Sequence, residues 1–167
     1  IVVPFAAGAG ADMASRFMAG KLAQRWDQGT VVDNQVGANS IIGAQQVARA
    51  PADGYTLLVP NDTTLAANPA LYAKLPYDPL RDFAPIALIG ETPFVLVASP
   101  SLKVRSVKEL VEAAKARPGE INFSSSGVAS AQHLPMEILM RSAGIRMLHV
   151  PYKGAAELLV SIGEELG

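Results

Sequence analysis

The chain contains 167 residues, half of which are apolar, and its 14 basic and 15 acidic side chains almost cancel. That balance excludes the positively charged surface by which proteins bind nucleic acid or anionic membranes. The sequence has no cysteine, which excludes a disulfide scaffold, a thiolate zinc site and a cysteine nucleophile. No apolar run approaches the roughly 18 residues that span a bilayer, so we expect no direct membrane insertion.

The first half alternates apolar runs with helical patterns. Residues 1–4 predict a buried strand, and a helix is predicted from Asp12, its expected N-cap. The inward face of that helix is expected to contain Ala14, Phe17, Met18, Leu22 and Trp26. Residues 30–34 predict a second strand, residues 40–50 a second helix and residues 55–59 a third strand. This order is typical of a parallel sheet with right-handed crossovers.

The pattern is interrupted and then resumes. Residues 60–85 lack a clear period and contain five prolines, which is typical of a functional segment or a lobe edge. Ser106 and Glu109 then form a capping box at the start of another helix. Residues 121–124 predict the next strand.

The last part of the chain repeats the alternation. A helix is predicted over residues 130–142, with Leu134 and Ile138 inward, or from a few residues later because Pro135 would lose an internal hydrogen bond. Residues 147–150 predict a strand, and a last helix begins near Ala155. We therefore expect two α/β lobes, 1–92 and 93–167. The second lobe is expected to be incomplete, because a parallel sheet usually continues with another strand.

Three loops of small residues each follow a strand and open a helix: 8–12, 37–40 and 125–130. Small side chains let a ligand approach the backbone, where the unpaired N–H groups and the dipole of a first helical turn attract an anion. In open α/β sheets, ligands lie beyond the carboxyl ends of the strands. These loops therefore predict a carboxylate site, although ordinary turn chemistry explains any one of them equally well.

Other kinds of site find little support. Gly8-Ala9-Gly10 lacks the third glycine of a dinucleotide fingerprint, and no phosphate-binding loop with lysine is present. His133 and His149 are sixteen residues apart without a carboxylate cluster, so we interpret them as structural hydrogen-bonding residues. No Gly-x-Ser-x-Gly elbow is present. We expect no catalytic residue, no metal and no cofactor.

Several motifs follow one another in a recognisable order. They are Val3-Pro4-Phe5 with Gly8, Gly10, Asp12 and Arg16; Gly43-Ala44 through Pro51-Ala52-Asp53-Gly54-Tyr55; Asn68-Pro69-Ala70-Leu71-Tyr72; Leu75-Pro76-Tyr77-Asp78-Pro79; Ser125-Ser126-Gly127 with Ser130 and His133-Leu134; and His149-Val150-Pro151-Tyr152-Lys153-Gly154. Along essentially the whole chain, the sequence resembles the substrate-binding proteins of tripartite tricarboxylate transporters, the Bug family.

The resemblance implies a two-lobed, periplasmic-binding-protein-like α/β fold of type II, with doubly wound sheets and a cleft that closes on its ligand. It implies an extracytoplasmic solute-binding protein that captures a di- or tricarboxylate or an acidic amino acid, passes it to membrane transporter subunits and catalyses nothing. The expected location is periplasmic, with the signal peptide absent from this chain. Two alternatives stay open: a sensor that passes cleft closure to a partner, and an α/β hydrolase-class enzyme.

The resemblance also implies which residues contact the ligand. They are Phe5, Gly8, Gly10, Ala11, Asp12, Asn61, Asp62, Thr64, Ser125, Ser126, Gly127, Ser130 and Tyr152. Gly8, Gly10 and Ala11 would donate backbone N–H groups. Thr64, Ser126 and Ser130 would donate hydroxyl groups, and Phe5 would form an apolar wall.

This sequence departs from the family pattern at a few positions. Asn39-Ser40 replaces a common Gly-Gly pair, and Ala129 replaces a common glycine. Asp62 replaces a residue that is usually neutral. A carboxylate beside an anionic ligand is repelled unless it pairs with a cationic group. Asp62 therefore motivates the hypothesis that the ligand is an amino acid or another zwitterion.

Overall fold

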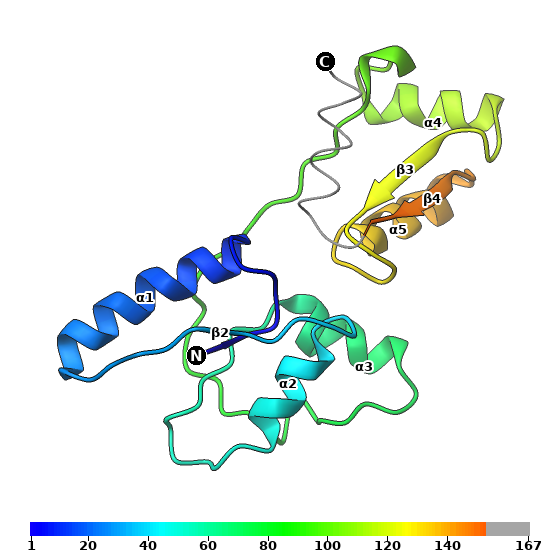
Figure 1. Cartoon of the computed structure of the whole chain (residues 1–167). Coiled ribbons are helices and arrows are strands. Elements are labelled where there is room, and N and C mark those ends of the chain that lie inside the picture. The colour runs from blue at the N-terminus through cyan, green and yellow to red at the C-terminus, as the bar shows by residue number, and fades with distance from the viewer. Residues whose placement is uncertain (153–167) are drawn as a thin grey trace. The chain divides into compact units, whose positions relative to one another are not determined.

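The computed structural model describes residues 1–152, in two compact α/β units whose boundary lies between Glu91 and Thr92 (Figure 1). Each unit contains one pair of parallel strands. The helix predicted near Ala155 lies outside the described residues. No helix in the described part of the chain is long and apolar enough to cross a membrane.

The sheet of the first unit is short and centred on strand β1 (Val2–Val3). Strand β2 (Asp33–Asn34) pairs with one edge of β1 in parallel register. On the other edge, the N–H of Val2 donates to the carbonyl of Leu57 at 2.7 Å, and the N–H of Val59 donates to the carbonyl of Val2 at 3.0 Å. The predicted third strand is thus present as a single parallel bridge beside β1.

Helices α1 (Gly10–Trp26) and α2 (Ile41–Ala48) lie on opposite sides of β2 in Figure 1. This is the arrangement that two right-handed crossovers in opposite directions produce. Helix α2 approaches the sheet closely, because a Cβ atom on Gly43 would lie 2.9 Å from the Cβ of Pro4. Ala44, in the same turn, is fully buried.

The predicted inward face of α1 is wrong for its two largest members. Phe17 and Trp26 are 69% and 55% exposed, whereas Asp12, Ser15 and Ala19 are buried. Helix α1 packs through small side chains, and the Ser15 hydroxyl donates to the carbonyl of Ala11 at 2.6 Å. Large apolar side chains therefore identified the wrong face of the helix.

The proline-rich segment contains two short helices. They are the π-helical turn η1 (Thr63–Ala67) and helix α3 (Asn68–Leu71). Residues 83–99 form no helix or strand, and the short 3₁₀ helix η2 (Pro100–Leu102) follows. Within the described chain, the apolar side chains Ile86, Leu88, Phe94, Val95 and Val97 are exposed.

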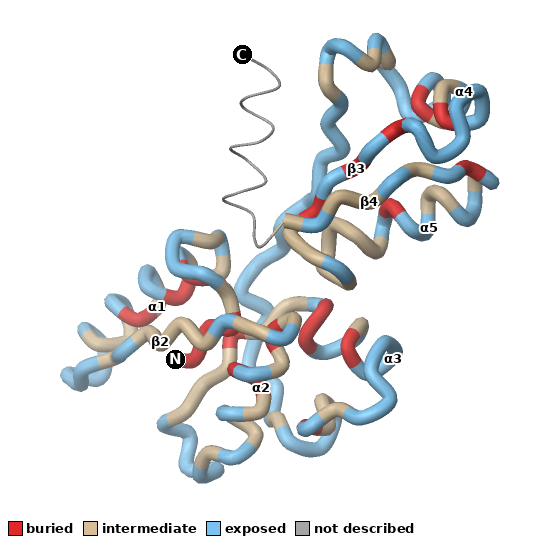
Figure 2. Tube along the Cα trace, turned by 45° about the vertical axis from the view of Figure 1, so that its right-hand side comes forward, coloured by how far each residue is buried: buried red, intermediate tan, exposed pale blue. Residues whose placement is uncertain are grey.

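The second unit contains strands β3 (Asn122–Ser125) and β4 (Leu148–Pro151), which pair in parallel along four residues. Helices α4 (Val107–Ala116) and α5 (His133–Ala143) accompany them. Ala114, Ile121 and Ile145 form the buried cluster of this unit. Figure 2 shows its buried residues along β3, α4 and α5.

Two predicted helix starts can be compared with the structure. The predicted Ser106 cap is confirmed, because its hydroxyl accepts the N–H of Glu109 at 3.2 Å. The other half of the capping box is displaced by one residue, since the Glu109 carboxylate accepts the N–H of Arg105 at 2.8 Å. Helix α5 begins at His133, not Ser130, so Pro135 is its third residue and forfeits no internal hydrogen bond. Ile138 was expected inward but is 69% exposed, while Met136 is buried.

Candidate functional site

Asp12 organises the first loop from inside. Its side chain is only 2% exposed. One carboxylate oxygen, Oδ2, accepts the N–H of Gly8 at 2.8 Å and the Nε–H of Arg16 at 3.0 Å. The other oxygen accepts Nδ2 of Asn34 at 2.9 Å, and the same amide group donates to the carbonyl of Phe5 at 3.0 Å. Asp12 therefore ties the first loop to the end of β2.

These donors keep the carboxylate charged. Hydrogen bonds from Arg16, the Gly8 amide and Asn34 lower the pKa of Asp12 to about 2, below its ordinary value of 3.8. The expectation that Asp12 is the N-cap is wrong. Ala9 is the N-cap and Asp12 is the third helical residue, so its side chain reaches back to an amide before the helix.

Two of the three backbone donors predicted in this loop are available. The N–H of Gly8 is already occupied by Asp12. The N–H groups of Gly10 and Ala11 have no acceptor among residues 1–152, as expected for the first two positions of a helix. Phe5 is half-buried at the end of β1. The loop thus presents two amides while Asp12 fixes its shape.

The loop after the third strand is also braced internally. Thr64 was expected to donate its hydroxyl to the ligand, but it is fully buried. Its hydroxyl lies 2.9 Å from Oδ1 of Asn61 and 2.7 Å from the hydroxyl of Ser40. The Nδ2 group of Asn61 has no acceptor within the described chain. Asp62 is exposed, and its carboxylate accepts the N–H of Thr63 at 2.8 Å.

A buried polar network behind this loop was not anticipated. Asn68 is fully buried; it accepts Nδ2 of Asn39 at 2.9 Å and donates to the carbonyl of Asn39 at 2.9 Å. It also donates to the hydroxyl of Tyr77 at 3.3 Å, and that hydroxyl donates to the carbonyl of Thr64 at 2.5 Å. The motifs containing Asn68 and Tyr77 therefore brace the loops. The sequence signal that could have pointed to these two residues is that both belong to motifs shared with the family.

The backbone before α2 is left-handed. Ala38, Asn39 and Ser40 have φ values of 46°, 54° and 71°. Such a run is unfavourable for residues with a Cβ atom, so the backbone here favours glycine. In this chain, side-chain hydrogen bonds from Asn39 and Ser40 accompany the strained conformation.

The loop of the second unit begins with a buried serine at the end of β3. The hydroxyl of Ser125 lies 2.9 Å from the carbonyl of Gly127, 3.2 Å from its N–H and 2.7 Å from Nε2 of His149. The carbonyl of Ser125 accepts the N–H of Tyr152 at 2.9 Å. Ser125, Gly127 and Tyr152 thus fix the loop next to the parallel strands. The hydroxyl of Ser125 is fully buried.

Ser126 and Ser130 are better placed to meet a ligand. Both are partly exposed. The hydroxyl of Ser126 donates to Oε1 of Gln132 at 2.7 Å. The hydroxyl of Ser130 accepts the N–H of His133 at 3.3 Å. Its own proton has no acceptor in the described part of the chain.

The two histidines lie against each other beneath this loop. Their rings are stacked with centroids 3.9 Å apart, and the ring of Phe123 lies 4.8 Å from that of His149. Burial, and then the charge of His133, lower the pKa of His149. Within residues 1–152, no group of three or more histidine and acidic side chains is arranged to hold a metal ion.

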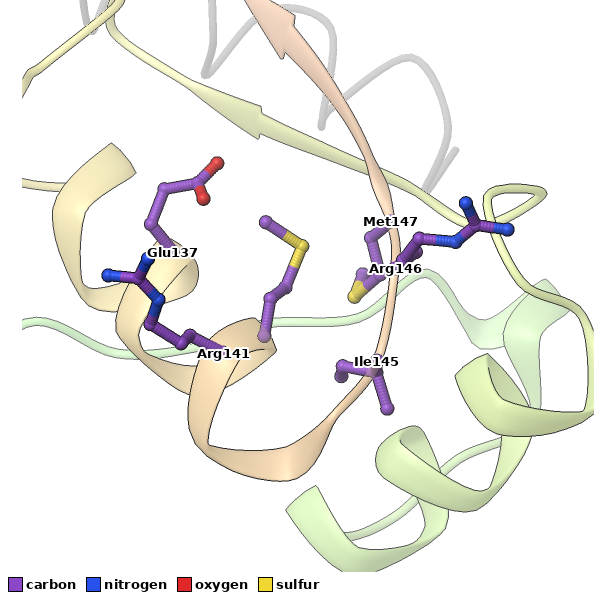
Figure 3. A pocket seen from close by; sticks show the side chains of 6 residues that line it. Glu137, Arg141, Ile145, Arg146 and Met147 are labelled. Carbon is purple, nitrogen blue, oxygen red and sulfur yellow. The ribbon is translucent and has the colours of Figure 1, made fainter.

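Two shallow hollows lie elsewhere. One, of about 380 Å³, lies between α5 and the segment that enters β4, and is lined by Glu137, Met140, Arg141, Ile145, Arg146 and Met147 (Figure 3). The other, of about 650 Å³, lies around Tyr77 in the first unit. Neither is lined by a residue that was predicted to bind the ligand.

Comparison with known proteins gives a consistent picture. The family model described as "Tripartite tricarboxylate transporter family receptor" matches residues 14–165. The protein BugT of Bordetella pertussis is 36% identical over 163 residues, which are 97% of this chain and 50% of BugT. The chain thus spans about half the length of the curated relatives that it matches.

Two solved structures contain bound dicarboxylates. One is described as "R. palustris Rpa4515 with adipate", with 37% identity, a TM-score of 0.88, and coverage of 98% of this chain and 55% of that one. The other is MatC from Rhodopseudomonas palustris with bound malate, with 30% identity, a TM-score of 0.84, and coverage of 98% and 56%.

Proposed function

Because this chain belongs to the family of tripartite tricarboxylate transporter receptors, we propose that it captures a small dicarboxylate. It delivers this ligand to the membrane subunits of such a transporter. The protein works in the periplasm as a two-lobed receptor of type II and performs no catalysis. Small-residue loops of this chain contact the ligand.

The observation that carries the proposal is the pair of unoccupied amides at Gly10 and Ala11. A carboxylate accepts two such N–H groups readily, and the positive end of α1 favours its charge. Asp12 holds the loop in place, so these amides are organised before the ligand arrives. The Nδ2 group of Asn61 and the hydroxyl of Ser130 are further unoccupied donors within the described residues.

The ligand class is drawn from relatives. Adipate and malate, the ligands of the two structural relatives, are dicarboxylates of different length. Each has a carboxylate at both ends, and the unoccupied amides of Gly10 and Ala11 suit one such carboxylate. We therefore propose linear dicarboxylates, from malate to adipate, as the class for this protein.

A proline substitution tests the proposed amide contact. Gly10 is the first residue of α1, where proline is tolerated because its missing N–H has no helical partner. Ala9 has φ of −66° and ψ of 158°, which suits a residue before proline. Gly10→Pro should weaken adipate or malate binding about 10- to 100-fold in calorimetric titration. Its melting temperature should stay unchanged.

Gly10→Ala is the matched control. It keeps the N–H group, and its Cβ would contact nothing within 4 Å. Its affinity should equal that of the wild type. Equal affinities of Gly10→Pro and Gly10→Ala would contradict the contact, and absence of binding to any dicarboxylate would contradict the proposed function.

Asp62 favours a second candidate ligand, an acidic amino acid. Its exposed carboxylate follows the strand end that also provides Asn61. A free carboxylate repels a second anion but attracts an ammonium group. If the ligand is aspartate or glutamate, Asp62→Asn should weaken its binding. If the ligand is a plain dicarboxylate, the same variant should strengthen its binding, and parallel titrations of aspartate and malate separate the two cases.

A further inference from the structure

The loop that opens α5 is held at both ends by the stacked histidines. His149 contacts its first residue, since Nε2 lies 2.7 Å from the hydroxyl of Ser125. His133 contacts its later part, since Nδ1 accepts the N–H of Ala129 at 3.0 Å. Ala129 has a φ of 62°, a conformation that a residue with a Cβ atom adopts at a cost. The hydrogen bond to His133 offsets part of that cost.

The bond to Ala129 fixes the protonation state of His133. An imidazole nitrogen accepts an N–H only through a lone pair, so Nδ1 carries no proton and the ring proton is on Nε2. Nε2 lies 3.2 Å from Oε1 of Glu137 and donates to it. A second proton on the ring would go to Nδ1. It would convert that nitrogen into a donor, which can no longer accept the amide of Ala129.

Side chains from α5, β3 and β4 lie against the ring of His133. Among residues 1–152, the charged or titratable groups that face its ring are Glu137, one turn along α5, and His149 on β4. The third ring of the stack, Phe123 on β3, is uncharged. The carboxylate of Glu137 accepts Nε2–H, and two charged rings with centroids 3.9 Å apart would repel each other.

We propose that His133 is a positioning residue for the ligand loop and that its neutral form holds the loop in the binding conformation. Acidification then breaks the hydrogen bond to the N–H of Ala129 and weakens ligand binding by the loop of the second unit. This inference rests on the proposed function, because it assumes that Ser126 and Ser130 meet the ligand. Histidine ordinarily takes up its proton between about pH 5 and 8, a range through which such a device operates.

Nuclear magnetic resonance of the ligand-free protein tests whether neutral His133 holds the amide of Ala129. At pH 8, the ¹⁵N shifts of the His133 side chain should show an unprotonated Nδ1, and the Ala129 amide should exchange slowly. As the pH falls, protonation of Nδ1 and a shift of the Ala129 amide should follow the same titration curve. A ring proton on Nδ1 at pH 8, or an Ala129 amide indifferent to the titration, would overturn the inference whatever the ligand.

Calorimetric titration with adipate at pH 8 and pH 5.5 tests whether protonation of His133 weakens ligand binding. Wild-type affinity should fall about 5- to 10-fold at the lower pH, as expected for the loss of one bond that orders the loop. In His133→Asn, the side-chain oxygen accepts the Ala129 amide at either pH. Its affinity at pH 8 should therefore equal that of the wild type and should decrease less at pH 5.5. Protonation of adipate itself affects both proteins equally, so the decrease that remains in His133→Asn measures its contribution. His133→Ala should bind weakly at both pH values.

Glu137→Gln sharpens the result. It keeps an acceptor for Nε2–H, so Nδ1 should stay unprotonated at pH 8 and the affinity there should equal that of the wild type. An identical pH dependence in wild type and His133→Asn would overturn the inference. Absence of binding in all variants at pH 8 would instead overturn the proposed function, and the resonance data would still decide the state of His133.

Discussion

The two units hold their small-residue loops with different chemistry. In the first, a buried carboxylate and a set of amides and hydroxyls fix the loops, through Asp12 and Asn68. In the second, two stacked rings, His133 and His149, contact the loop. Carboxylates with a pKa near 2, amides and hydroxyls keep their state throughout the physiological range, whereas histidines do not. The comparison teaches that similar loops can differ in their response to pH.

The largest loss of stability is expected when the amide network of the first unit is broken. Asn68→Ala removes the hydrogen bonds that the buried Asn68 side chain makes with the side chain and carbonyl of Asn39 and with the hydroxyl of Tyr77. We expect a cost of about 2–4 kcal/mol in the free energy of unfolding. Trp26 is the only tryptophan in the chain, so its fluorescence in a urea titration reports on this unit.

A matched control uses Gln24, which is exposed on α1. Gln24→Ala should change the free energy of unfolding by less than about 0.5 kcal/mol. If Asn68→Ala and Gln24→Ala unfolded at the same urea concentration, the network would not stabilise the first unit.

A smaller, pH-dependent loss of stability is expected when Asp12 is replaced. Its pKa of about 2 lies below the ordinary 3.8. The carboxylate therefore stabilises the fold fully above about pH 4, and this contribution is lost as the pH falls through 2. Asp12→Asn should lower stability at neutral pH and flatten its decline between pH 4 and 2. Urea titrations followed by Trp26 fluorescence measure this decline.

The exposed carboxylate of Asp53 provides the control for that experiment. It accepts the N–H of Tyr55 in a surface turn. Asp53→Asn should leave the decline between pH 4 and 2 as steep as in the wild type. A wild-type decline that persists unchanged in Asp12→Asn would mean that other carboxylates govern acid unfolding.

The smallest effects, and the only gains, are expected at the left-handed alanines. Ala38 and Ala129 have φ values of 46° and 62°. Glycine relieves this strain but gains freedom in the unfolded chain, so each substitution should add about 0.5–1 kcal/mol of stability. Trp26 fluorescence measures Ala38→Gly, and hydrogen exchange of β3 amides measures Ala129→Gly.

Ala14 lies within α1, where glycine is unfavourable. Ala14→Gly should therefore cost about 1 kcal/mol, in the opposite direction. Equal signs for Ala14→Gly and Ala38→Gly would show that backbone strain before α2 does not limit stability.

Much of the element order follows from local patterns. Turn residues and apolar runs predicted the alternation, and the serine and glutamate of the capping box predicted the start of α4. Periodicity failed where a helix packs through small or polar side chains, as α1 does at Asp12 and Ser15. The predicted third strand is reduced to one bridge, because its residues contact β1 only at Val2.

The small-residue loops could be located from the sequence, but the hydrogen-bond partners of their residues could not. Thr64 and Ser125 look like ligand donors because their hydroxyls stand in small-residue loops. Both are fully buried, and their partners, such as Tyr77 and His149, are distant in sequence. Long-range pairing of polar groups has no period, so it emerges only from the fold.

Pro135 has a consequence for what the second loop can become. It has no N–H to offer and its ring collides with the carbonyl four residues earlier, so α5 cannot lengthen backwards to include Ser130. The residues between β3 and α5 are thereby barred from winding into regular structure. Their main-chain groups bond locally instead, as the N–H of Ser130 does to the carbonyl of Gly127 at 3.2 Å. A shorter loop could therefore not be compensated by a longer helix.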